Sequence, residues 1–145
     1  MAGTARANNI QVTNLTLTGN TGTSALVQFD LSWENSWRGG GVNNWDAAWV
    51  FVKYRTIGGV WQHVFLNNTG HTAPAGSMID LGLLIPGGTP WDANTNPVIG
   101  TFIRRNADGN GTFALTGVQL RWNYGTQGLA YNDIAQVQVF ATEMV

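Results

Sequence analysis

Alternation of apolar and polar residues with a period of two runs through most of this 145-residue chain. In residues 25–33, four large apolar side chains share one phase, and Gln28, Asp30 and Ser32 occupy the other. Residues 134–144 alternate in the same way over their whole length. This period is typical of half-buried β-strands, and no stretch shows the longer period of an amphipathic helix. The chain is therefore predicted to fold almost entirely into strands.

Eight segments carry this pattern or a short apolar run bounded by turn residues. They are residues 9–18, 25–33, 46–56, 60–66, 77–84, 98–105, 113–124 and 134–144. Gly58-Gly59 and Asp108-Gly109 predict tight hairpin turns between strands that are neighbours in the sequence. In the first segment the apolar phase slips by one position after Val12, which predicts a β-bulge.

Eight antiparallel strands joined by turns and loops favour an all-β fold. We expect a β-sandwich of two antiparallel sheets, of the jelly-roll or Greek-key type, with a closed barrel as the alternative. Thr, Asn and Gly make up 50 of the 145 residues, a composition that favours strands and tight turns over helices. The expected organisation is a short N-terminal arm, residues 1–8, and a single domain, residues 9–145.

Charge and cysteine content exclude several classes of function. Charged residues form only 10% of the chain and the net charge is −1, so no basic stripe is present to bind nucleic acid. No apolar run is long enough to span a membrane, and the first residues, MAGTARANN, lack the apolar centre of a signal peptide. The absence of cysteine rules out disulfides and thiolate chemistry. Such low charge is typical of extracellular or particle-bound proteins, and we expect that location.

Residues 33–55 hold four of the seven tryptophans and the only lysine. The second half of this run, residues 46–56, has apolar residues on both phases until Lys53 and Arg55 place charge on one of them. This pattern predicts a central strand that is covered on both faces at its start and leaves the core at its end. The first half, residues 34–44, contains three consecutive glycines and two asparagines before Trp45, which predicts a loop.

Three tryptophans lie in expected loops, where a large aromatic side chain either folds onto the core or meets a partner. Sugar rings stack on such residues, with Asn and Asp side chains as hydrogen-bond partners. The candidate ligand-binding residues are Trp37, Arg38, Asn43, Asn44, Trp45, Asp46 and Trp91. In the alternative interpretation, Trp37 and Trp45 only pin a glycine-rich loop across the end of the sandwich. The tryptophans of the expected strands are assigned to the core: Trp33, Trp49, Trp61 and Trp122.

The sequence shows no catalytic constellation. Glu34 and Asp46 are the only acids in the aromatic stretch, and an Asp just before a strand is more often a backbone cap than a catalyst. Asn106, Asp108 and Asn110 stand at alternate positions, like the start of a calcium loop, but the bidentate acid that would complete the loop is missing. A plain hairpin turn is favoured there. We predict no enzymatic activity and no cofactor.

Several longer motifs point to one family. The chain contains the strings SWENSWR, NWDAAWVFVKYR, WQHV, GHTAPAGS, GVQLRWNYG and VQVFATEMV. Together they resemble the amino-terminal domain of secreted Bacteroidetes proteins of the formylglycine-generating-enzyme-like (sulfatase-modifying factor) family. The resemblance covers the chain from about Asn8 to Val145.

The resemblance implies a β-rich accessory domain. In that family the domain precedes an enzyme-like module, which joins it just after the position of Glu143-Met144-Val145. The catalytic module is not in this sequence, so no catalytic residue is carried over. A stand-alone relative carried on a virus or other particle and an excised domain are both open interpretations.

Two functional hypotheses follow. The first is a non-enzymatic structural module whose neutral Thr-, Asn- and Gln-rich faces pack against copies of itself or against a neighbouring structural protein. The second is a carbohydrate-binding module in which Trp37, Trp45 or Trp91 stacks on a sugar and Asn43, Asn44 and Asp46 bind its hydroxyls. The expected partners are a homo-oligomer or neighbouring protein in the first case and a glycan in the second.

Overall fold

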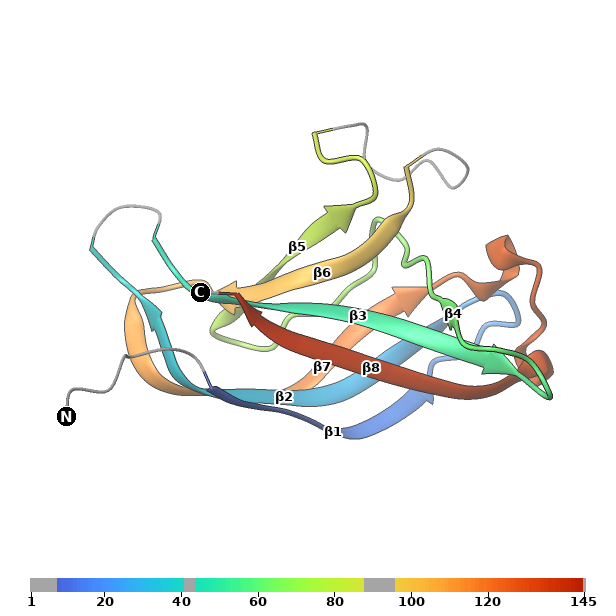
Figure 1. The fold of residues 1–145 in the computed structure, drawn as a ribbon, viewed down its shortest axis with the longest axis horizontal. Helices are drawn as coiled ribbons and strands as arrows, with labels where there is room; N and C mark the ends of the chain where they lie inside the picture. Colours follow the sequence, from blue (N-terminus) through green and yellow to red (C-terminus); the bar gives the residue numbers. More distant parts are fainter. Residues whose placement is uncertain (1–7, 41–43, 88–95, 145) are drawn as a thin grey trace.

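The computed structural model describes residues 8–40, 44–87 and 96–144 (Figure 1). Its strands are β1 (Asn8–Thr18), β2 (Ala25–Arg38), β3 (Ala47–Thr56), β4 (Gln62–His63), β5 (Ser77–Leu83), β6 (Val98–Arg105), β7 (Gly109–Trp122) and β8 (Ile134–Met144). Two single-turn 3-10 helices, η1 (Tyr124–Gln127) and η2 (Tyr131–Asp133), connect β7 to β8. The strands form two antiparallel sheets, which confirms the predicted all-β sandwich.

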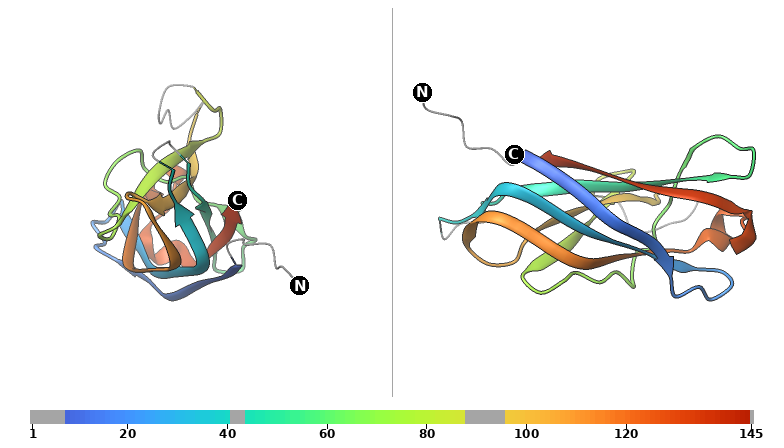
Figure 2. Two further views of the ribbon diagram at one scale, coloured as in Figure 1. Left: turned by 90° about the vertical axis from the view of Figure 1, so that its left-hand side faces the viewer. Right: turned by 90° about the horizontal axis from the view of Figure 1, so that it is seen from below.

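The two sheets form the two layers of the sandwich (Figures 1 and 2). One has the strand order β1-β2-β7. The other has the order β8-β3-β6-β5: β8 pairs along the whole length of β3, and β6 and the two-residue β4 pair with different parts of its other edge. Antiparallel pairs β2–β7 and β3–β6 are nested in the sequence, and the chain crosses between sheets after β2, β6 and β7. This nesting is typical of a jelly roll.

The core lies between the sheets and is made by the inward phase of each long strand. The predicted phase of β2 is confirmed, since Val27, Phe29, Leu31 and Trp33 are all buried. Aromatic rings join the two layers, with Tyr54 of β3 against Trp122 of β7 at a centroid distance of 5.1 Å. Other buried core residues are Ala25, Ala48, Val50, Val52, Val64, Leu66, Val98, Ile103, Phe113, Leu115, Val118, Leu120, Tyr124 and Val139.

Strand β2 is longer than the sequence predicts. It continues to Arg38, through residues that were expected to form a loop, because Ser36–Arg38 pair with Gly109–Gly111 of β7. Asn35 has a positive φ of 57°, and the register shifts between Trp33 and Ser36. The extra residue is thus absorbed as a β-bulge, and long-range pairing overrides the local preference for a loop.

The two turn predictions have different outcomes. Gly58-Gly59 lies in the connection between β3 and the antiparallel β4, with a hydrogen bond of 2.9 Å from Gly59 N to Thr56 O, but this connection covers residues 57–61 and is longer than the predicted tight turn. The Asp108-Gly109 hairpin prediction is wrong, because β6 and β7 lie in different sheets and this turn carries the chain from one layer to the other. The bulge predicted in β1 is confirmed by the register shift between Thr13 and Thr16.

The strand tryptophans do not all reach the core. Trp33 and Trp122 are buried as expected. Trp61 lies outside β4, which has only two residues, and its side chain is 40% exposed, so its assignment to the core is wrong. Trp49 is half-buried and lies on the outer face of β3. Among the described residues, no helix is long and apolar enough to cross a membrane.

Candidate functional site

The residues proposed for ligand binding meet at one end of the sandwich, where β2 ends and β3 begins. We call this the tryptophan end and define it by Trp37, Arg38, Trp45 and Asp46. Arg38 and Trp45 form an isolated antiparallel bridge, and Asp46 N donates a hydrogen bond of 3.0 Å to Trp37 O. Asn44 is exposed and lies beside them. The remaining candidates, Asn43 and Trp91, lie outside the described residues.

Asp46 is the buried anchor of this end, with a relative exposure of 0%. Its carboxylate accepts hydrogen bonds from Trp33 Nε1 at 2.9 Å, Ser36 Oγ at 3.0 Å and Trp37 N at 3.1 Å. A buried carboxylate needs such donors, and here they come from β2. The prediction that Asp46 binds the hydroxyls of a sugar is therefore wrong, because its oxygens face into the protein.

Arg105 is linked to this carboxylate through a hydroxyl. Its Nε donates to Ser36 Oγ at 2.9 Å, and the same oxygen carries the proton donated to Asp46. The guanidinium also lies 4.6 Å from the ring centroid of Phe113 and donates to Gly111 O at 3.3 Å. The guanidinium of Arg105, a residue of β6, is thus fixed by contacts with β2 and β7 of the opposite sheet.

Two arginines contact the ring of Trp45. The Cζ atom of Arg104 lies 3.9 Å and that of Arg38 5.0 Å from the centroid of its ring. Each arginine also has an acid: Arg104 Nε is 2.7 Å from Asp80, and Arg38 Nε is 3.7 Å from Asp108. Cation–π contacts of this kind use the ring faces on which a sugar would stack.

Trp37 and Trp45 do not form one platform. Side chains alternate along a strand, so Trp37 lies on the opposite face from its neighbour Arg38. Trp45 is bridged directly to Arg38 and shares its face. Trp37 instead lines a separate shallow hollow of about 400 Å³ with Asn35, Ser36, Asn110 and Gly111.

The calcium-loop candidates serve the connection between the sheets. Asn106 N donates to Gly76 O at 3.0 Å, the Asp108 carboxylate faces Arg38, and Asn110 pairs with Trp37 in the β2–β7 ladder. No group of three or more His, Cys, Asp and Glu side chains that could hold a metal occurs in the part of the chain that the structure describes.

A second candidate site lies on the outside of the larger sheet. We call it the aromatic face and define it by Trp49, Phe51, His63, Phe102 and Phe140. Trp49 packs against Phe102 at 4.7 Å, and Phe51 stacks on Phe140 at 5.1 Å and on His63 at 5.7 Å. These residues alternate with the buried phase of their strands, so their rings lie on the side away from the core.

Glycines make room for Trp49 on this face. Gly82 of β5 and Gly100 of β6 are paired across the sheet, and a Cβ atom at either position would collide with the Trp49 ring. The indole therefore lies flat against backbone, beside an apolar hollow of about 330 Å³. The sequence contains a signal for this face, because Trp49 and Phe51 form a second apolar phase in residues 46–56. That phase alone predicts only that both faces of the strand are covered.

The edge beside the aromatic face is nearly uncharged. β8 pairs with β3 along one side, and no strand in the described ranges pairs with its other side. Its outward residues next to Phe140 are neutral, namely Gln136, Gln138 and Thr142, and they are exposed as their phase predicts. Glu143 is the only charged residue of the strand. Natural edge strands usually carry charges that block pairing with another chain.

Comparisons with known proteins identified no relative of this chain. No protein-family model matches the sequence, and neither curated proteins nor solved structures give a match. The resemblance to the formylglycine-generating-enzyme-like accessory domain stays a prediction.

Proposed function

We propose that this domain is a non-enzymatic structural module that associates with copies of itself through the aromatic face. The observation that supports this proposal is the cluster of rings around Phe51 on the outside of the larger sheet. The outer face of an antiparallel sandwich is normally polar. Aromatic side chains that lie there instead are characteristic of the central part of a protein interface.

The charged residues on this side of the sheet flank the rings, and Lys53 pairs directly with His63. Lys53 and Arg55 lie beyond Phe51 along β3, and Asp80 is ion-paired with Arg104 on the far side of Phe102. Between them the surface is aromatic, Gln or Thr. A contact centred on the rings that keeps Lys53 and Arg55 of one copy away from those of the other avoids electrostatic repulsion between like charges.

The outer edge of β8 has no hydrogen-bonded partner strand among the described residues, although residues 134–137 lie beside β1, and it gives the association a second component. An edge strand without a pairing partner offers unpaired backbone groups, and only Glu143 would oppose addition of another strand. Pairing of this edge between two copies would place Phe140 of each near the contact. We therefore infer a contact between like subunits that includes both β8 and the aromatic face.

Analytical ultracentrifugation over a wide range of concentrations tests the proposal. We expect the average mass to rise with concentration and Phe140→Glu to suppress the rise, since Phe140 is 36% exposed and tolerates a polar substitution. Ile57→Glu is the matched control, because Ile57 is an exposed apolar residue in the β3–β4 turn, away from the aromatic face. A monomer at all concentrations contradicts the proposal.

Carbohydrate binding is the second candidate, and among the described residues Trp45 and Asn44 favour it most. The observation that favours it is that Trp45 stays half-exposed, with the exposed Asn44 immediately before it. A glycan array followed by Trp45→Ala tests this function. Binding that is unchanged in a folded Trp45→Ala variant would exclude this site.

We also propose that the domain acts outside the cell or on a particle surface, as an accessory module of the kind that the sequence motifs resemble. Its low charge and its neutral Thr- and Asn-rich composition support this location. This location can be tested by fractionating the cells that naturally produce the protein and detecting the domain with an antibody. Recovery only from the cytoplasm would contradict it.

A further inference from the structure

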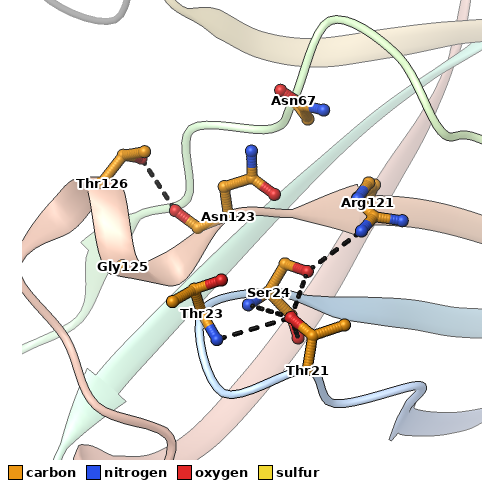
Figure 3. Close-up of a pocket in the computed structure, with 8 residues that line it drawn as sticks. All are labelled: Thr21, Thr23, Ser24, Asn67, Arg121, Asn123, Gly125 and Thr126. Carbon is orange, nitrogen blue, oxygen red and sulfur yellow. Dashed lines mark hydrogen bonds between the residues drawn. The ribbon is translucent and has the colours of Figure 1, made fainter.

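A polar hollow of about 690 Å³ lies at the end of the sandwich opposite the tryptophan end (Figure 3). The β2–β7 ladder joins the two ends, since Arg38 pairs with Gly109 at one end and Ala25 with Trp122 at the other. Three segments line the hollow: the β1–β2 turn, the chain after β4, and the end of β7 with η1. The lining residues are Thr21, Thr23, Ser24, Asn67, Arg121, Asn123, Gly125 and Thr126.

Arg121 is the only charged residue among them. Its Nη2 donates to Ser24 Oγ at 3.2 Å, and no acidic side chain of the described residues lies within ion-pair distance of its guanidinium. Arg38 and Arg104, by contrast, each have an Asp partner at the other end. Arg121 therefore keeps most of its five donors available to a ligand.

The position of Arg121 is fixed by its surroundings. Gly70 has a φ of 89°, and a Cβ atom there would collide with Arg121 Cδ, so the glycine makes room for the side chain. Arg121 N donates to His71 Nδ1 at 3.0 Å, and His71 Nε2 donates to Asn67 O at 2.6 Å. One histidine thus ties together two of the segments that line the hollow.

The hydroxyl groups in the hollow are also ordered. Ser24 Oγ and Thr21 Oγ1 are hydrogen-bonded at 2.9 Å, and Thr126 Oγ1 donates to Asn123 O at 2.8 Å. In Figure 3 the side chains of Asn123 and Ser24 lie on either side of the space between these segments. The hollow thus combines one cation with hydroxyl and amide groups and has no carboxylate among its lining residues.

We propose that this hollow binds an oxyanion group carried by a small hydroxylated molecule. The guanidinium of Arg121 binds two oxygens of a carboxylate, sulfate or phosphate side by side, the geometry for which arginine is suited. The hydroxyls and amides around it bind the polar remainder. The hollow shares no lining residue with the aromatic face, so anion binding and self-association can be tested separately.

Nuclear magnetic resonance titration of the wild-type domain at low ionic strength tests the proposal. The probes are inorganic sulfate, inorganic phosphate and glucuronate, with glucose as the neutral control. We expect saturable shifts of the Ser24, Arg121 and Asn123 amides with at least one anion, and the anion bound most tightly identifies the group. Absence of saturable shifts with all three anions, or equal shifts with glucose, overturns the proposal.

The variant Arg121→Gln distinguishes specific anion binding in the hollow from non-specific attraction of anions to the protein. We expect affinity for the preferred anion to fall at least about tenfold, as expected on loss of a charged hydrogen-bond donor. Arg55→Gln removes the same charge on the outer face of the other sheet, where Arg55 does not line the hollow, and should leave affinity unchanged. Equal affinity of the two variants overturns the proposal. If Arg121→Gln does not fold, Asn123→Ala replaces it, with a smaller weakening expected and unchanged affinity as the contradicting result.

Discussion

The two ends of the sandwich differ in how their polar groups are used. At the tryptophan end, the Asp46 carboxylate accepts three hydrogen bonds within the protein, and Arg38 and Arg104 each contact an acid and the Trp45 ring. At the polar hollow, Arg121 has a hydroxyl partner but no acid among the described residues. The polar groups of the tryptophan-rich end are bonded to each other within the protein. At the polar hollow, by contrast, Arg121 keeps hydrogen-bond donors available for a ligand. In this protein, hydrogen-bond donors that lack a partner within the protein therefore indicate a ligand-binding site better than the types of residue present.

Removal of the Asp46 carboxylate should have the largest effect. We expect Asp46→Ala to lower the free energy of unfolding by about 3–5 kcal/mol, because it leaves two buried donors and one partly buried donor without an acceptor. Urea denaturation measures this loss. Asp108→Ala is the control, since Asp108 is exposed and its ion pair with Arg38 should contribute less than about 1 kcal/mol. Similar small losses in both variants would mean that the tryptophan end is not bonded as described.

Truncation of Trp49 tests how far the aromatic face is part of the isolated fold. A fully buried Trp such as Trp33 should cost about 3–5 kcal/mol on replacement by Ala. Trp49→Ala should cost less, about 2–3 kcal/mol, because one side of its ring rests on Gly82 and Gly100 and the rest is partly exposed. Chemical denaturation of both variants gives the ranking, and a larger loss for Trp49→Ala would place this face inside a core.

Replacement of Trp45 should have an intermediate effect. Trp45→Ala removes ring contacts with Arg38 and Arg104, and we expect a loss of about 1–2 kcal/mol. Trp61→Ala removes a single, longer contact with Arg55 at 5.8 Å, and a loss below about 1 kcal/mol is expected. Thermal unfolding of the two variants makes the comparison. Equal losses would show that the arginines contribute nothing through the Trp45 ring.

Arg121 should contribute little to the stability of the fold. Arg121→Gln removes one hydrogen bond to Ser24 and no ion pair with a described residue, so the free energy of unfolding should change by less than about 1.5 kcal/mol. The same substitution should weaken anion binding strongly. Denaturation without and with the preferred anion separates the two effects, and a large loss of stability without ligand would assign Arg121 to the structure.

His71 should make stability depend on pH near neutrality. Burial lowers the pKa of His71 below its ordinary value of 6.5, and the charge of Arg121 acts in the same direction, against the hydrogen bond to Asn67 O. The unfolded chain then takes up a proton at a higher pH than the folded chain. Stability should therefore fall as pH decreases through about 6.5 and level off below the folded pKa. Denaturation of His71→Gln should lack this step, and an unchanged step would assign it to another group.

The smallest effects are expected on the outward phase of β8. Gln136→Ala and Gln138→Ala should change the free energy of unfolding by no more than about 0.5 kcal/mol, because both side chains are exposed. Association between copies should be weaker in the same variants. Denaturation beside sedimentation distinguishes the two contributions. A large loss of monomer stability from either variant would mean that the face of β8 is assigned the wrong way round.

The sequence predicted the strands better than the site. Alternation located β6 and β8 to the residue, and the phase of Val27 and Phe29 identified the core. The sequence did not show that the turn at Asp108-Gly109 joins two different sheets, because a local turn signal contains no information about which sheet the next strand enters. The burial of Asp46 depends on donors 9 to 13 residues away, and Arg121 and Ser24, which meet in the polar hollow, are 97 residues apart. No local pattern encodes such contacts.

Hydrogen–deuterium exchange of the wild-type domain at low and high concentration tests the central claim most directly, because it locates the contact between copies as well as detecting it. We expect amides of β8 and the aromatic face, around Phe140 and Phe51, to gain protection as concentration rises, while those near Asn44 and Thr126 at the two ends do not. Protection that is independent of concentration along β8, or gained only at the ends, would contradict association through the aromatic face.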